Sequence, residues 1–110
     1  MSRPFGFCRE QRLGSRDVAA TLAAGRRFLQ ETLQVQVRKN GLELARLGLI
    51  VPKRFLPSSV DRNLVKRQAR EWFRLRQNAL KGRDVLIRLT APRTALRRVV
   101  EDLDRLGVSA

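Results

Sequence analysis

The chain has 110 residues, which is enough for one domain with a modest hydrophobic core. Its 24 lysines and arginines against 10 acidic residues give a formal net charge of +14, which favours polyanionic partners, above all nucleic acid. The single cysteine, Cys8, excludes an internal disulfide, and the sequence shows neither an apolar run of about 20 residues nor a signal peptide. We therefore predict one cytoplasmic domain over residues 1–110, without a membrane partner.

The first part of the chain is predicted to be an arm followed by a short helix. Residues 1–12 show no clear period and are interpreted as an irregular arm. Residues 15–24 have the pattern of a helix whose start is capped by Ser15. Val18 and Leu22 form an apolar pair one turn apart on it.

Three later segments place apolar residues at alternate positions, as half-buried strands do: residues 32–38, 45–51 and 85–89. Asn40 and Gly41 indicate a turn after the first of them. The connection that follows is longer than a two-residue hairpin.

Residues 58–80 form the longest predicted helix, and its two sides differ in chemistry. Ser58 or Ser59 can cap its start, and Asp61 lies in the first turn, where the helix dipole favours a carboxylate. At about 100° per residue, one side is apolar and consists of Val65, Ala69, Trp72, Phe73, Ala79 and Leu80. The other side is basic and consists of Asn63, Lys66, Arg67, Arg70 and Arg74.

The basic side has two interpretations, a solvated helix face or a contact surface for phosphates. Arginine outnumbers lysine there, and the planar guanidinium suits phosphate oxygens. The acids of the helix are only Asp61 and Glu71, so the interleaved carboxylates of an ordinary charged surface are missing. We favour the contact surface.

A last helix over residues 94–106 completes the order helix–strands–helix–strand–helix. This order is typical of an α+β fold built as a two-layer α/β sandwich. The long helix, between strands that end at Val51 and begin at Val85, fits a crossover that joins parallel strands. Such crossovers are generally right-handed.

The sequence offers little catalytic chemistry of its own. It has no histidine and no tyrosine, and one cysteine cannot form a zinc cluster. Glu101, Asp102 and Asp104 form the one acidic group that could hold a cation, but an ordinary helix surface explains them better. We predict no catalytic residue and no metal site in the protein alone.

Residues 62–71, RNLVKRQARE, resemble the pattern R-N-x-x-K-R-x-x-R-E of the bacterial ribonuclease P protein subunit. The strand that precedes this helix in the family is similar to residues 47–54, LGLIVPKR. The length, the basic charge and the order of elements fit the family over nearly the whole chain.

The resemblance implies a subunit that binds a large catalytic RNA and the 5′ leader of precursor tRNA. It implies that the subunit assists endonucleolytic removal of the leader, while the RNA and its bound Mg²⁺ perform the hydrolysis. The protein alone would then bind no cofactor and need no protein partner. The resemblance also implies a left-handed crossover at the long helix and a leader cleft between the first helix and the sheet.

The resemblance places RNA contacts on the long helix, at Arg62, Asn63, Lys66, Arg67 and Arg70. Arg74 extends this surface along the helix, and Lys53 and Arg54 extend it at the end of the preceding strand. For Asn63, a second interpretation is a helix-capping residue.

The chain departs from the family pattern at several positions. Leu64 stands where a basic residue often follows the asparagine, and Pro52 stands where serine is usual. Val18 and Leu22 occupy positions where the first helix commonly carries aromatic residues that face the leader cleft. For these two, we favour ordinary core packing over a cleft.

Two other functional classes remain as alternatives. A basic ribosomal protein or an RNA chaperone would share the size and charge, with no role in tRNA processing. A protein-only nuclease would need a cluster of histidines or carboxylates, and the sequence offers none.

Overall fold

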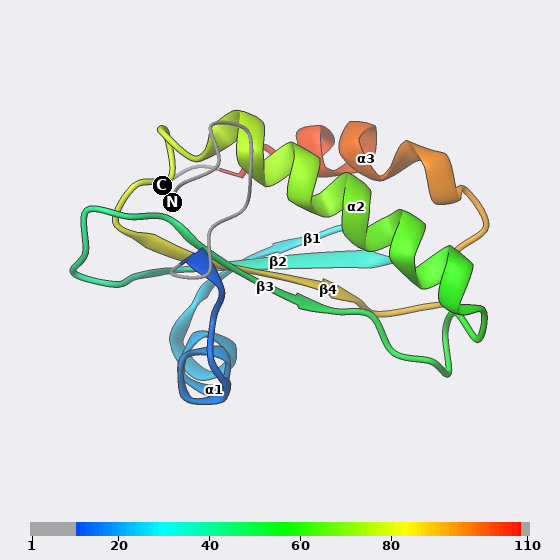
Figure 1. Cartoon of the computed structure of the whole chain (residues 1–110), viewed down its shortest axis with the longest axis horizontal. Helices are drawn as coiled ribbons and strands as arrows, with labels where there is room; N and C mark the ends of the chain where they lie inside the picture. The colour runs from blue at the N-terminus through cyan, green and yellow to red at the C-terminus, as the bar shows by residue number, and fades with distance from the viewer. Residues whose placement is uncertain (1–10, 109–110) are drawn as a thin grey trace.

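The computed structural model describes residues 11–108 and builds them around one sheet flanked by helices (Figure 1). In chain order the elements are α1 (Ser15–Ala24), β1 (Arg26–Leu29), β2 (Leu33–Lys39), β3 (Arg46–Ile50), α2 (Ser59–Arg76), β4 (Arg83–Leu89), the 3₁₀ turn η2 (Leu96–Arg98) and α3 (Val99–Arg105). The predicted α+β class and order of elements are confirmed. Most of the predicted arm, including Cys8, lies outside the described residues.

The sheet has the strand order β1-β2-β4-β3. β2 pairs antiparallel with β1 and with β4, whereas β3 lies parallel to β4 and is connected to it through α2. The predicted crossover between parallel strands is therefore confirmed. Because β4 separates β2 from β3, the turn at Asn40-Gly41 opens a loop between strands that are not partners. Gly41 has a φ of 72° there, and Asn40 Oδ1 accepts the N–H of Leu42.

Two local predictions were wrong, and one strand was not predicted. Strand β1 was missed because it is four residues long and only partly buried, which gives no measurable period. Ser15 does not cap α1, because Gly14 is the N-cap residue and no side chain bonds there. The final helix is divided at Val99, where the side chain of Gln68 accepts the backbone N–H at 3.1 Å and starts α3 as a separate helix.

The main core lies between the sheet and the helices α2 and α3, which together cover one of its faces (Figure 1). Val35 and Val85 contribute from the sheet, Trp72 and Phe73 from α2, and Leu103 from α3. Each of these side chains is at most 1% exposed. Burial of one large apolar side chain stabilises the fold by roughly 1.5–3 kcal/mol, so this contact determines which side of α2 faces inward.

Helix α1 lies on the opposite face of the sheet (Figure 1). The sheet beneath it combines the buried Leu86 with polar residues. Gln36 Nε2 donates to the carbonyls of Thr21 and Leu22 at 3.2 and 3.1 Å. The bond to Leu22 satisfies a carbonyl in the last turn of α1, whereas the Thr21 carbonyl also accepts the N–H of Gly25 at 2.7 Å. The predicted two-layer sandwich thus describes α2 and α3 on the sheet, and α1 adds a partial layer on the other side.

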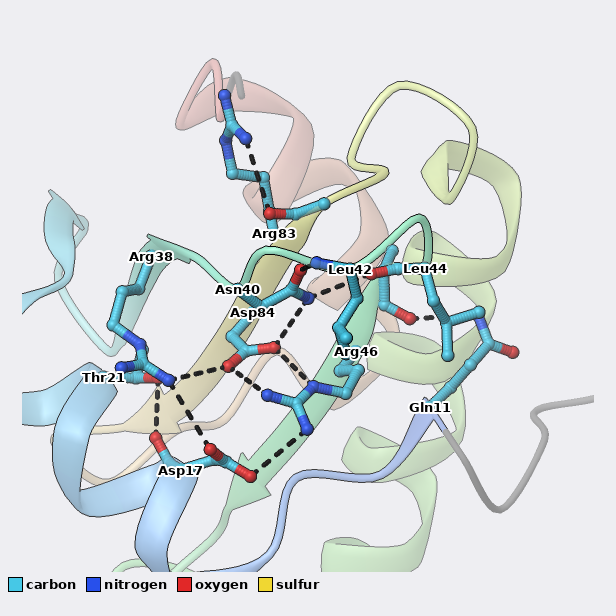
Figure 2. A network of polar contacts seen from close by, with 12 residues as sticks. Gln11, Asp17, Thr21, Arg38, Asn40, Leu42, Leu44, Arg46, Arg83 and Asp84 are labelled. Atoms are coloured by element: carbon cyan, nitrogen blue, oxygen red, sulfur yellow. Dashed lines mark hydrogen bonds and ion pairs between the residues drawn. The ribbon is translucent and has the colours of Figure 1, made fainter.

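A buried carboxylate connects α1 to three strands (Figure 2). Asp84 in β4 is fully buried and accepts hydrogen bonds from Arg46 Nε at 2.7 Å, Asn40 Nδ2 at 3.0 Å and Arg38 Nη2 at 3.1 Å. Arg46 also reaches Asp17 in α1, at 3.2 Å. Burial alone raises the pKa of Asp84, but the hydrogen bonds from Arg46, Asn40 and Arg38 outweigh it, so the pKa lies below its ordinary value.

We predict that Asp84→Asn lowers the free energy of unfolding by about 3 kcal/mol, because it leaves the guanidinium groups of Arg38 and Arg46 with only Asp17, whose side chain is 32% exposed, as a counter-charge. This value is at the low end for a broken buried pair, since the Arg38 side chain is 29% exposed. Urea denaturation at neutral pH measures it.

The matched control is Glu101→Gln, which breaks an exposed pair with Arg98 and should change stability by less than about 0.5 kcal/mol. Because the folded pKa of Asp84 is lowered, its stabilisation is present above the ordinary aspartate value of 3.8 and is lost as the pH falls below it. The stability of the Asp84→Asn variant should not show this decrease at acidic pH. Equal stability of the two variants would contradict the role given to Asp84.

Candidate nucleic-acid interface

Helix α2 presents its basic side to solvent. Its start is capped by Ser58, whose Oγ accepts the N–H of Asp61 at 3.5 Å. Asn63, Arg67 and Arg70 are all exposed on the side that faces away from the core. None of these three forms an ion pair with another residue in the range 11–108.

The first two residues of the motif, Arg62 and Asn63, differ in their contacts. Arg62 is half-buried, and its Nη1 donates to the carbonyls of Leu56 and Pro57 at 2.9 and 2.7 Å. It therefore fixes the start of α2 against the preceding loop. Asn63 is not the capping residue, because Ser58 fills that position, and its amide remains exposed.

Arg74, at the other end of the basic side, is paired within the helix. Its guanidinium donates to both carboxylate oxygens of Glu71, at 2.6 and 3.0 Å. The hydrogen bond from Arg74 lowers the pKa of Glu71, which stays ionised at neutral pH. Glu71 thus offsets part of the positive charge at this end of the surface.

The loop between β3 and α2 carries two more of the predicted cations. Lys53 and Arg54 are exposed in a turn closed by the carbonyl of Pro52, which accepts the N–H groups of Phe55 and Leu56 at 3.1 and 3.2 Å. The Arg54 guanidinium lies 4.7 Å from the centre of the Phe55 ring, and Phe55 packs against the core. This stacking orients Arg54 beside the start of α2.

The predicted cleft residues Val18 and Leu22 are half-buried on α1 and lie outside the main core cluster. A hollow of about 260 Å³, which neither residue lines, lies at the ends of β3 and β4 and is lined by Ile50, Pro52, Arg54, Phe55, Arg88, Leu89 and Thr90. The choice between core packing and a leader cleft for Val18 and Leu22 stays a prediction.

Arg88 was not predicted as a site residue, and it ends a ladder of hydrogen bonds across the sheet. Arg88 Nη2 donates to Gln34 Oε1 at 3.3 Å, and Gln34 Nε2 donates to Gln36 Oε1 at 2.9 Å. Gln36 in turn bonds to α1, as described above. Arg88 Nε is buried and has no partner among the residues described. Its position on the polar face of its strand was the only signal available in the sequence.

The three acidic residues of α3, here called the α3 trio, each form an ion pair with an arginine. Glu101 pairs with Arg98 at 3.1 Å, Asp102 pairs with Arg93, and Asp104 pairs with Arg76. Within residues 11–108 no three side chains of histidine, cysteine, aspartate or glutamate form a group suited to a metal ion. The helices in the same range include none with the length and apolarity to cross a membrane.

Three comparisons identify the family. The Ribonuclease P family model matches residues 7–106. The chain is 62% identical over 55 residues to the ribonuclease P protein component of Ralstonia pickettii, covering 50% of this chain and only 39% of that one. It is 41% identical over 86 residues to the component of Nitrosococcus oceani, covering 77% and 72%. The RNase P protein structure from Thermotoga maritima superposes with a TM-score of 0.72 at 29% identity, covering 90% of this chain and 98% of that one.

None of these relatives is a ribosomal protein or an RNA chaperone, so that alternative is not supported. The family match extends over both the basic helix and the sheet that holds it. The chain belongs to the ribonuclease P protein family.

Proposed function

We propose that this chain binds the catalytic RNA of ribonuclease P and the 5′ leader of precursor tRNA, and assists removal of the leader. The proposal is based on the basic side of α2, which is exposed and largely unpaired. The apolar side of the same helix is buried and fixes the orientation of the helix. Family membership supports it, together with the cytoplasmic location predicted from the sequence.

Arg67 and Arg70 neutralise RNA phosphates in this proposal, and Lys66 does so beside β3. The Asn63 amide has both hydrogen-bond donors and an acceptor, so in this proposal it makes a contact of defined orientation with the RNA. Arg62 acts by holding the helix start, because its guanidinium is committed to the loop carbonyls. Mg²⁺ is assigned to the RNA, since each acid of the α3 trio is paired with an arginine.

The leader is proposed to lie on the face of the sheet that carries α1. Arg88 and Arg54 both line the hollow at the ends of β3 and β4, so this region offers positive charge beside an aromatic ring. Val18 and Leu22 provide no ring for stacking on bases. The leader backbone would therefore be held by charge and shape.

The proposed function is tested by cleavage of precursor tRNA at low Mg²⁺, with the protein alone, with the catalytic RNA alone, and with both. We expect no cleavage by the protein alone and faster cleavage when the protein joins the RNA. Cleavage by the protein alone would favour a nuclease, and an RNA reaction that the protein leaves unchanged would favour a general RNA-binding protein.

The contact surface predicts a steep loss of RNA affinity with salt, because bound cations release counterions from RNA. The Lys66→Ala/Arg67→Ala variant should reduce the slope of log K against log salt by roughly 1.4–1.8, at about 0.7–0.9 per phosphate contact. Filter binding over a salt series measures the slope.

The matched control is Arg97→Ala/Arg98→Ala, which removes the same charge from η2. This turn packs beside Gln68, on a different side of α2. Its slope should stay close to that of the parent protein. Equal reductions in both variants would mean that net charge, and not the basic side of α2, controls binding.

Glu71 is predicted to restrain RNA binding, because it neutralises Arg74. Glu71→Gln removes that charge and should tighten RNA binding by roughly two- to fivefold at low salt, with a smaller gain at high salt. Titration of the catalytic RNA measures the affinity. Glu101→Gln, which frees Arg98 on another surface, serves as the control and should leave affinity unchanged. Weaker binding by Glu71→Gln would show that Arg74 needs its pair to be positioned.

A further inference from the structure

Strand β3 forms one edge of the sheet, and the described residues cover only its beginning. Arg12 bridges to Leu47, and the N–H of Leu13 donates to the Leu47 carbonyl at 3.0 Å. The chain then turns into α1 at Ser15, away from this edge. An uncovered strand edge presents unpaired N–H and C=O groups to whatever approaches it.

Leu49 is the first strand residue beyond this cover whose backbone points outward. The Leu47 carbonyl points away from β4, because it accepts a bond from Leu13. Backbone groups of a strand point to alternate sides along the chain, so the N–H and C=O of Leu49 have the same outward direction. No backbone bond from Leu49 to another of residues 11–108 exists on that side.

The open edge faces two cations of α2 across a pocket of about 270 Å³. Its walls are formed by Arg12, Leu13, Leu47, Gly48, Leu49, Lys66 and Arg70. Lys66 and Arg70 are one helical turn apart, so both side chains approach the edge from the same side. The volume exceeds the ~30 Å³ that one water molecule occupies in the liquid, so a group larger than water fits.

A backbone N–H between two cations suits a phosphate oxygen better than another strand. A peptide strand at this edge would bring a neutral backbone to Lys66 and Arg70 and leave their charges uncompensated. A phosphodiester supplies the negative charge and accepts the N–H bond, and charge-assisted bonds of this kind are the stronger ones. The half-buried side chain of Leu13 can contact the ribose.

We propose that the edge of β3 and the facing turn of α2 form a subsite for one phosphodiester group of bound RNA. The Leu49 N–H donates to a phosphate oxygen, while Lys66 and Arg70 flank that phosphate. This subsite rests on the proposed RNA-binding function. It goes beyond that function by adding a main-chain donor from the sheet to the side chains of the helix.

The test is amide hydrogen exchange at Leu49, with the full chain free and bound to saturating catalytic RNA. Exchange proceeds in the complex, is quenched, and is detected by NMR after removal of the RNA. We expect exchange at Leu49 to slow by about tenfold or more in the complex, as a hydrogen bond to a charged acceptor provides. In Lys66→Ala/Arg70→Ala, which can still bind through Arg67, this slowing should be lost.

Arg97→Ala/Arg98→Ala is the control of equal charge, and its Leu49 amide should be slowed as in the parent protein. The buried Val85 amide in β4 reports an intact fold in every variant. Bound RNA with unchanged exchange at Leu49 would overturn the subsite. Slow exchange at Leu49 already in the free protein would overturn it as well, because another segment would then occupy the edge. Failure of the RNA to bind, seen by gel mobility, would overturn the proposed function together with the subsite.

Discussion

The pairing of acids with arginines is the interaction on which the rest of this structure depends. A chain with a net charge of +14 repels itself, so compaction requires that cations inside the fold be neutralised. Asp84 neutralises charge between α1 and the sheet, and Asp102 does the same for Arg93 beneath α3. Because these acids lie away from the basic side of α2, they leave that side almost uncompensated. The same distribution of charge that permits folding therefore concentrates positive potential on one surface.

The apolar side of α2 turns this concentration of charge into a fixed geometry. Trp72 and Phe73 are each 1% exposed, so any rotation of the helix about its axis would bring large rings into water. The hydrogen bonds of Arg62 at its start and the contacts of Gln68 with η2 and α3 hold the helix at two further points. Arg67 and Arg70 are consequently held on a rigid frame before any ligand binds. Preorganisation of this kind lowers the entropy lost on binding.

Much of this arrangement follows from local sequence patterns, and the remainder depends on contacts between distant residues. The two sides of α2 were predictable because Val65, Ala69, Trp72 and Phe73 recur with the helical period. The Arg46–Asp84 pair joins residues 38 positions apart, and no local pattern connects them. The position of β3 at the edge of the sheet depends on the strand order β1-β2-β4-β3, which pairs strands that are not consecutive in the chain. The hydrogen bonds of Arg62 depend on the path of the loop before α2, which no local sequence pattern reveals. The family motif therefore led to the prediction that Arg62 contacts RNA.

In the proposed function, the chemistry available near α1 determines how leaders of different sequence are bound. Phosphate contacts position a nucleic acid without reading its sequence, whereas base stacking and hydrogen bonds to base edges introduce preferences. On this face the structure offers guanidinium groups and glutamine amides, with Phe55 as a ring at the margin. The ladder from Arg88 through Gln34 to Gln36 ends on carbonyls of α1, so these amides are already committed within the protein. What remains for a ligand is chiefly positive charge, and a surface of that kind holds a strand by its backbone and tolerates different bases.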